Sequence, residues 1–205
     1  MPRGSTGYRN LWALTVLCLL RERPMHPYEM QRLIRQRHND QFLDLKRGSL
    51  YHAIERLQKA GLIDPIETSR EGRRPERTTY RLTEIGEREV LDWLRELLAK
   101  PACEPSQFVA ALSFVQHLST EDALDQLQMR VQRLEMGIVA ISAVLERLMP
   151  QIGRACLVEA EYMRALRQAE LDWVRSVIAD IRAGRLTWGH RSPCPMPDTP
   201  PPSEG

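Results

Sequence analysis

The chain has 205 residues, of which 42% are hydrophobic and 27% are charged, the composition of a soluble globular protein with room for one or two cores. Residues 1–100 carry 19 Lys and Arg against 14 Asp and Glu, and residues 101–205 carry 10 against 13, which favours a polyanionic partner for the first half over mere scatter in surface charge. The cysteine spacing excludes a zinc module and is typical of a reducing cytoplasm; the cysteines are Cys18, Cys103, Cys156 and Cys194.

The first predicted element is a buried helix near the N-terminus. Residues 1–8 are expected to be flexible, and residues 9–23 contain the apolar run "LWALTVLCLL". Ten apolar residues are too few to span a bilayer. A secretory signal peptide is the alternative, but "RERPMHP" follows in place of a small-residue cleavage site. We therefore predict a helix enclosed by its neighbours in a cytoplasmic protein.

Two more helices and a β-hairpin are predicted next. Pro27 suits the first turn of a helix over residues 27–36, and Gly61 closes a third helix over residues 49–60. The segments "LIDPIET" and "TTYRLT" have the pattern of two strands, and the arginine-rich turn "SREGRRPER" lies between them. Three helices followed by a hairpin is the order of a winged helix-turn-helix, which we place at residues 9–83.

The next helix is predicted over residues 84–100, with Thr83 as its N-cap. It connects the winged helix-turn-helix to the second half, and "KPACEP" breaks it. A short apolar helix then follows over residues 108–118. The tail, residues 186–205, contains six prolines between positions 193 and 202 and is expected to be disordered.

The second half is predicted to be an antiparallel helical dimerisation domain, residues 105–185. One long helix carries an uninterrupted heptad seam about 36 Å long, and Pro150 and Gly153 end it. The last helix runs over residues 158–183. We expect a partner subunit to cover the seam, and a self-contained helical hairpin is the alternative. The predicted dimerisation residues are Leu124, Leu127, Val131, Leu134, Ile138, Ile141, Leu145, Leu148, Tyr162, Leu166 and Trp173, with Ala169, Val177 and Ile181 also on the inner face of the last helix. The predicted fold is therefore mainly α with a small β-hairpin.

The third helix has the division of faces that a DNA recognition helix needs. Four apolar residues share one face, and the opposite face is polar, so one side can be anchored while the other enters the major groove. Glu55 would repel phosphate unless it accepts from cytosine or pairs with Lys59 at i+4. The arginine-rich turn matches a wing that follows the DNA backbone. The predicted DNA-binding residues are Lys46, Arg47, Gly48, Ser49, Tyr51, His52, Arg56, Arg70, Arg73, Arg74 and Arg77.

Four motifs in residues 9–90 resemble the N-terminal domain of the PadR family of bacterial transcriptional regulators. They are "P-x-H-x-Y-E" from Pro24, "G-S-L-Y" from Gly48, "L-x-x-x-G-L-I" from Leu57 and "Y-x-L-T-x-x-G" from Tyr80. The second half is similar to the larger branch of that family, whose C-terminal helices dimerise. The resemblance implies a homodimeric repressor on a palindromic operator, released by a small aromatic or phenolic effector.

The resemblance leaves the effector site open. Trp12, Trp93 and Trp173 are the candidate ligand residues, because flat aromatic walls suit flat ligands. A tryptophan on the inner face of a helix is more often part of a core or of a dimer interface. The sequence identifies neither the operator nor the effector.

An enzyme and a protein-interaction module are the two alternatives to DNA binding. The chain has none of the common catalytic or nucleotide-binding motifs, so we expect no enzyme, no cofactor and no metal site. A protein-interaction module built on a winged-helix scaffold and heptad helices is the main alternative. Salt distinguishes the two, since binding through several phosphate contacts collapses as salt rises, whereas apolar heptad contacts persist.

Overall fold

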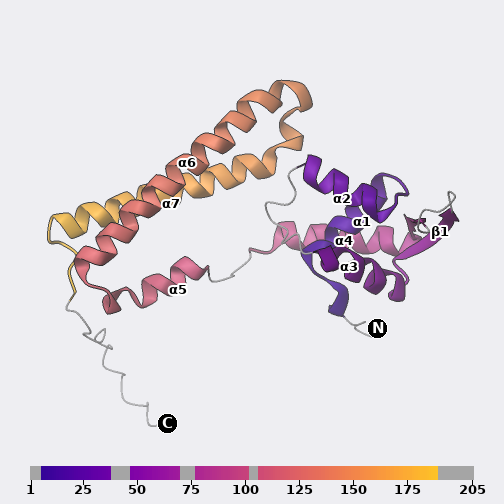
Figure 1. The fold of residues 1–205 in the computed structure, drawn as a ribbon, viewed down its shortest axis with the longest axis horizontal. Coiled ribbons are helices and arrows are strands. Elements are labelled where there is room, and N and C mark those ends of the chain that lie inside the picture. The colour runs from indigo at the N-terminus through magenta and orange to yellow at the C-terminus, as the bar shows by residue number, and fades with distance from the viewer. Residues whose placement is uncertain (1–5, 38–46, 70–76, 102–105, 189–205) are drawn as a thin grey trace, which may run out of the picture. The chain divides into compact units, whose positions relative to one another are not determined.

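The structure is a computed structural model, and it describes residues 6–37, 47–69, 77–101 and 106–188. The chain divides into two compact units, residues 1–103 and 104–205, shown in Figure 1. Several predicted features lie outside the described residues: Lys46, the wing arginines Arg70, Arg73 and Arg74, and residues 189–205 of the tail. Arg47 and Arg77 are described only by their backbone.

The first unit begins with a short 3-10 helix, η1 (Thr6–Tyr8), which lies within the N-terminal residues predicted to be flexible. Tyr8 packs against the core of this unit. The helices are α1 (Leu11–Glu22), α2 (Pro27–Gln36), α3 (Arg47–Lys59) and α4 (Glu84–Ala99). Asn10 N-caps α1 by accepting from the amide of Ala13.

The predicted signals at the ends of these helices act as expected. Pro27 occupies the first position of α2. Gly61 follows α3 with a φ of 70°, a left-handed conformation that costs glycine little. The Oγ1 of Thr83 caps α4 by accepting from the amide of Gly86. These local interactions set the end of α3 before the hairpin and the start of α4 after it.

The hairpin pairs β1 (Ile63–Ser69) with β2 (Arg77–Leu82) in antiparallel register, with Ile63 opposite Leu82. The register shifts between Pro65 and Glu67, where the proline has no amide to donate. Met25, in the turn before α2, adds a bridge to this sheet. Its amide and carbonyl both bond to Tyr80 at 3.1 Å, and the sequence pattern did not predict this third segment.

The core of the first unit lies between α1, α2, α3 and α4. Val90 and Trp93 of α4 are buried in it, so α4 is an integral part of the first unit and more than a connecting helix. The other buried residues of this core are Ala13, Val16, Leu17, Leu19, Leu20, Met25, Met30, Ile34, Leu50, Ala53, Ile54, Leu57, Leu62 and Ile63. The predicted mainly α fold with a two-stranded hairpin is confirmed.

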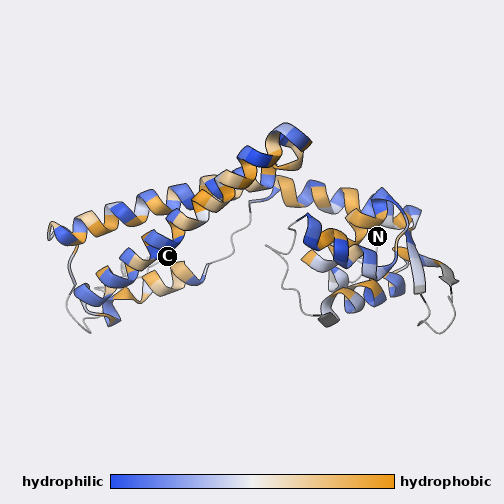
Figure 2. Cartoon of the chain, turned by 45° about the horizontal axis from the view of Figure 1, so that its top comes forward, coloured by the Kyte–Doolittle hydropathy of each residue, from blue (hydrophilic) through white to orange (hydrophobic). Residues whose placement is uncertain are grey.

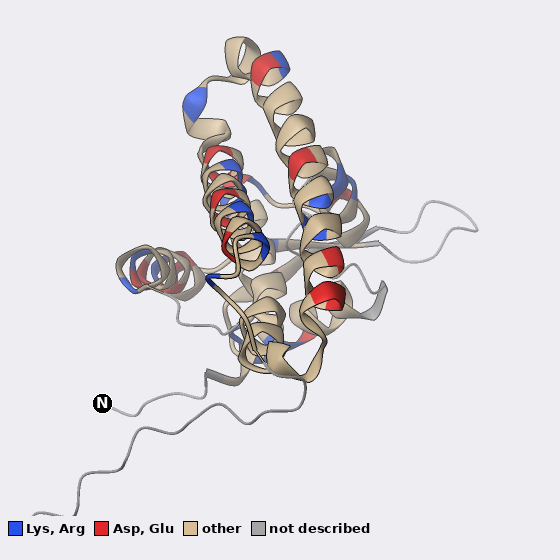
Figure 3. Cartoon of the chain, turned by 90° about the vertical axis from the view of Figure 1, so that its left-hand side faces the viewer, with Lys and Arg blue, Asp and Glu red and all other residues tan. Residues whose placement is uncertain are grey.

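The second unit contains α5 (Gln107–Ser113), η3 (Val115–His117), α6 (Thr120–Ile152), η4 (Arg154–Cys156) and α7 (Val158–Arg182). The long helices α6 and α7 lie side by side as an antiparallel pair, seen in Figure 1. Hydrophobic and hydrophilic residues interleave along both helices, as Figure 2 shows. Acidic and basic residues also interleave there, as Figure 3 shows, so neither helix presents a continuous basic face.

Three predicted boundaries in the second unit are corrected. The short helix predicted over residues 108–118 is α5 followed by a separate 3-10 turn. Pro150 lies inside the last turn of α6 and does not end it. The proline lacks its own backbone donor, but the turn still closes because the amide of Gly153 donates to the carbonyl of Met149. The third boundary is that of the tail, which was predicted to begin at residue 186, whereas the structure describes residues up to Trp188. The Nε1–H of Trp188 donates to the carbonyl of Leu118.

Part of the α6 seam is covered within one chain, and the expectation that a partner subunit covers the rest stays a prediction. Leu127, Ile141 and Leu145 are buried in the single chain. Leu127 packs in a cluster with Val174, Ile178 and Ile181 of α7, and Leu124 and Val131 lie against this cluster. Ile141 and Leu145 pack with Leu157, and Leu148 lies against them. Between the clusters, Leu134 and Ile138 are half-buried. A self-contained hairpin accounts for the three buried positions, and the half-buried positions leave surface that a partner could cover.

The predicted inner face of α7 is also partly wrong. Tyr162, Leu166, Ala169 and Trp173 are exposed in the single chain, because the face that meets α6 is rotated away from them. The buried residues of α7 are Leu171, Val174, Ile178 and Ile181. Of the residues predicted to point inward, Ile181 is buried and Val177 is half-buried.

Candidate nucleic-acid interface

Helix α3 is anchored through one face, as the sequence predicts. Leu50, Ala53, Ile54 and Leu57 are each 3% exposed or less and belong to the first core. At 3.6 residues per turn these positions recur on one side of the helix. Because this side is fixed in the core, the opposite side has a defined orientation and is free to meet a partner.

The opposite side of α3 is polar and open to solvent. Tyr51 is 54% exposed, and the side chains of His52, Glu55 and Lys59 are exposed as well. Lys59 Nζ lies 2.6 Å from Glu55 Oε1. Its hydrogen bond lowers the pKa of Glu55 below the ordinary value, so the carboxylate is charged and partnered. This pairing offsets the one acidic group on a surface that would otherwise meet phosphate.

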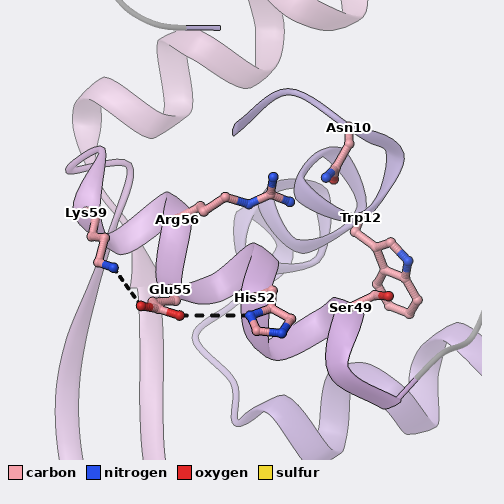
Figure 4. Close-up of a pocket in the computed structure, with 7 residues that line it drawn as sticks. All are labelled: Asn10, Trp12, Ser49, His52, Glu55, Arg56 and Lys59. Atoms are coloured by element: carbon pink, nitrogen blue, oxygen red, sulfur yellow. Dashed lines mark hydrogen bonds and ion pairs between the residues drawn. The ribbon is translucent and has the colours of Figure 1, made fainter. Parts of the chain in front are cut away.

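Arg56 is oriented by the N-terminal segment of the chain. Its Nη1 donates to the carbonyl oxygen of Gly7 at 3.3 Å. Arg56 borders an open hollow of about 470 Å³ between α1 and α3, drawn in Figure 4. Its lining residues are Asn10, Trp12, Ser49, His52, Glu55, Arg56 and Lys59. The sequence pattern did not indicate Asn10, because the α3 residues that line the same hollow are distant from it in sequence.

The N-terminal segment is itself held on α4. Arg9 donates from Nε and Nη2 to Glu89 Oε1 at 2.9 and 2.7 Å, and from Nη1 to Glu96 Oε2 at 2.9 Å. Its guanidinium also lies 5.4 Å from the ring centroid of Trp93, within the range of a cation–π contact. Residues 6–10 therefore join α4 to the edge of α3.

The three candidate ligand tryptophans are divided between the two units. Trp93 is only 6% exposed and belongs to the first core, which leaves it little surface for a ligand. Trp12 borders the hollow beside α3. Trp173 belongs to the second unit, where its ring meets Phe108 edge-on at 6.1 Å. Among the described residues, no group of His, Cys, Asp and Glu side chains could hold a metal ion.

Within the ranges that the structure describes, no helix combines the length and the apolar character required to cross a bilayer.

Of the predicted DNA-binding residues, Ser49, Tyr51, His52 and Arg56 are brought together on the open side of α3. Their contact with DNA stays a prediction.

Comparison with known proteins identifies the first unit. Residues 16–92 match the Transcriptional regulator PadR-like family. The chain therefore contains a domain of the PadR-like family of transcriptional regulators. Because the members of this family regulate transcription, the expectation that the protein is no enzyme is confirmed. The Negative transcriptional regulator PadR of Bacillus subtilis (strain 168) is 23% identical, over 81% of this chain and 94% of that protein.

Solved structures share the fold of this PadR-family chain across both units. Bacillus subtilis PadR in complex with operator DNA matches with a TM-score of 0.69 at 21% identity, covering 84% of this chain and 99% of that one. The same protein in complex with p-coumaric acid matches at 0.70 and 19%, with the same coverage. The Vibrio cholerae virulence activator AphA matches at 0.64 and 16%, again over 84% and 99%. The winged-helix unit and the C-terminal helices are thus a shared architecture.

Proposed function

We propose that this PadR-family regulator is a homodimeric repressor that binds a palindromic operator. The observation that carries the proposal is the division of α3, whose apolar face is buried while Ser49, Tyr51, His52 and Arg56 face solvent. In this proposal α3 enters the major groove. Lys46, Arg47 and Gly48 lie at its start, and the wing carries Arg70, Arg73, Arg74 and Arg77 to the DNA backbone. The matching PadR of Bacillus subtilis is described as a negative transcriptional regulator, and one of its solved structures is a complex with operator DNA.

A second copy of the chain is proposed to cover the apolar surface that α7 leaves open on α6. Met136 and Val139 are 65% and 68% exposed, and the segment "GIVAISAVL" over residues 137–145 has no charged residue. One side of this segment packs on the chain's own α7 and η4 region. An exposed apolar surface of this kind is typical of an interface.

The exposed residues of α7 extend the proposed dimer surface. Tyr162, Leu166 and Trp173 were predicted to dimerise, and all three are exposed in the single chain, although one edge of Trp173 meets Phe108. To read a palindrome with two half-sites, two α3 helices related by a dyad would have to lie about 34 Å apart, one turn of DNA.

Release by a small aromatic or phenolic effector is the last part of the proposal. It is supported by the matching complex of Bacillus subtilis PadR with p-coumaric acid. In this chain, Trp173 and Phe108 form an aromatic pair in the second unit, and the Arg130 guanidinium lies 3.4 Å from the centroid of Phe108. Aromatic walls with a nearby cation suit a flat, acidic ligand.

The test is selection of fragmented genomic DNA on the purified protein, followed by anisotropy titration of the best fragment at several salt concentrations. A short palindrome bound by a dimer, with affinity falling steeply between about 50 and 200 mM salt, is the expected result. Weak, sequence-blind binding that candidate aromatic acids do not restore would overturn it. The protein-interaction alternative would then be favoured, and binding through the heptad helices would persist at high salt.

A further inference from the structure

The hollow between α1 and α3 has more hydrogen-bond donors than acceptors to serve them. Among the described residues, the indole N–H of Trp12 and the hydroxyl of Ser49 have no hydrogen-bond partner, and Arg56 uses one of its five N–H groups on Gly7. The lone acceptor of Asn10, Oδ1, is occupied by the amide of Ala13, which leaves its amide nitrogen as a donor. His52 adds its ring at the floor of the same hollow (Figure 4).

Such a surplus of donors is suited to an anion with several acceptor oxygens. Lys59 and Glu55 border the hollow as a pair whose charges offset each other, so the guanidinium of Arg56 carries the local positive charge. The indole of Trp12 forms an apolar wall beside these donors, as Figure 4 shows. A phosphate with its attached sugar has the matching chemistry, because its oxygens accept hydrogen bonds and its sugar carbon atoms pack on a flat ring.

We infer that this hollow seats one deoxyribose-phosphate unit of the DNA backbone, with Asn10 and Trp12 of the α1 end joining Ser49, His52 and Arg56 of α3 as DNA contacts. The inference rests on the proposed function and extends the interface beyond the recognition helix and the wing. Phosphate contacts of this kind fix the register of a protein on the duplex without reading its sequence. The seat assigns Trp12 to DNA in place of an effector.

The N-terminal segment builds this seat. Arg9 fixes the segment on α4 through Glu89 and Glu96, and Asn10 then begins α1 at a defined point. The carbonyl of Gly7 holds Arg56 at the rim of the hollow. The seat therefore depends on contacts between residues 6–10, α3 and α4, all within the first unit.

Asn10→Asp is the test that separates DNA contact from folding. Aspartate caps a helix as well as asparagine does, and a negative charge is favourable at that end of α1, so the fold is retained. The same charge would repel a phosphate in the seat. The matched control is Ser106→Asp, which places the same charge at the N-cap of α5, where Ser106 accepts from the amide of Val109.

The readout is anisotropy titration of the selected operator and of an unrelated duplex of the same length, with the unfolding midpoint of each variant recorded. Asn10→Asp is expected to weaken both duplexes by about tenfold, whereas Ser106→Asp stays within about twofold of the wild type. Trp12→Phe, which keeps a ring and removes the N–H, should weaken both duplexes several-fold. If the wild type binds the operator and Asn10→Asp binds it equally well, the seat is wrong and the proposed function stands. If the wild type binds no DNA, both fail.

Discussion

Arg9 and Glu89 are joined by two hydrogen bonds, although 80 residues of chain separate them. Both side chains are largely covered, with 25% and 21% of their side-chain surface exposed. A guanidinium presents its donors in a rigid fork, so the pair sets the orientation of the N-terminal segment on α4 as well as its position. This contact makes η1 and α4 parts of one structural unit.

Removing the fork should destabilise the first unit. Arg9→Ala leaves Glu89 without its partner in a partly buried position, and we expect a loss of about 1–3 kcal/mol in the free energy of unfolding. Arg9→Lys should recover only part of this, because an ammonium cannot bridge Glu89 and Glu96 with the same geometry. Urea denaturation followed by circular dichroism measures the effect.

The control for this variant is an exposed pair on the same helix. Arg95 lies 2.7 Å from Asp92, and both side chains are open to solvent. Arg95→Ala should change stability by no more than about 0.5 kcal/mol. An equal effect of the two substitutions would mean that Arg9 acts only through surface charge.

Gly86 allows α4 to approach closely the backbone of Leu62, in the segment between α3 and β1. A Cβ at this position would lie 2.1 Å from the carbonyl oxygen of Leu62 and 2.8 Å from Cδ1 of Leu82. The first of these atoms belongs to the backbone and cannot move aside by changing rotamer. Gly86→Ala should therefore lower the unfolding free energy by about 2 kcal/mol or more, measured by thermal or urea denaturation.

Gly137 also lies inside a helix, but Gly137→Ala is expected to stabilise the protein. A Cβ at Gly137 of α6 would meet only the Arg167 side chain, at 3.6 Å, which is ordinary contact. Alanine is favoured over glycine inside a helix by about 1 kcal/mol. The unfolding free energy should rise, and a fall comparable to that of Gly86→Ala would contradict the local geometry described for both glycines.

The proposed dimer surface predicts different outcomes for two faces of α6. Met136→Glu puts a charge on the exposed face and should convert the dimer to a folded monomer, seen by sedimentation velocity and circular dichroism. Ile141→Glu puts the charge into the cluster that α6 forms with Leu157 and should disrupt the hairpin itself. Gln126→Glu adds the same charge at an exposed polar position and should leave the dimer unchanged. A Met136→Glu protein that stays dimeric at micromolar concentration would rule out this face.

The pairing of Glu22 with Arg37 predicts a pH dependence of stability. Arg37 Nη2 donates to Glu22 Oε2 at 2.8 Å, and this hydrogen bond lowers the pKa of Glu22 below its ordinary value. A carboxylate with a lowered pKa stabilises the fold at pH values above its unfolded pKa, and the contribution is lost as pH falls through the folded pKa.

The measurement is the unfolding free energy of the wild type and of Glu22→Gln between pH 7 and pH 3. The wild type should be the more stable at pH 7, and the difference should shrink below about pH 4.5, where the unfolded carboxyl takes up its proton. A difference that is constant over this range would show that packing, and not charge, connects α1 to the end of α2.

Local sequence signals determined the order of elements in the first unit, because each acts within one turn of chain. Pro27 begins α2, Gly61 ends α3, and Thr83 caps α4, as their contexts predict. The alternation of apolar and polar residues likewise predicts which side of α3 is buried, since helical periodicity needs no knowledge of the partner. The polar face of the candidate site could therefore be named from the sequence.

Contacts between distant residues could be found only in the tertiary structure. The bridge from Met25 to Tyr80, the clamp from Arg9 to Glu89, and the place of Asn10 beside α3 leave no periodic signal. Trp93 follows Val90 by three residues on α4, and its burial depends on the packing of α4 against the rest of the first core. The folded chain brings these residues together, and the residues next to them in sequence do not indicate the contact.

The heptad pattern of α6 determined that an apolar seam exists, and it did not determine what covers the seam. A helix from the same chain and a helix from a partner offer the same kind of apolar surface, so both satisfy the pattern. The turn at Gly153, with a φ of 78°, brings α7 back along α6, and Leu127, Ile141 and Leu145 are buried without a partner. Only the tertiary structure decided this, because burial depends on which surfaces meet and not on the period along one helix.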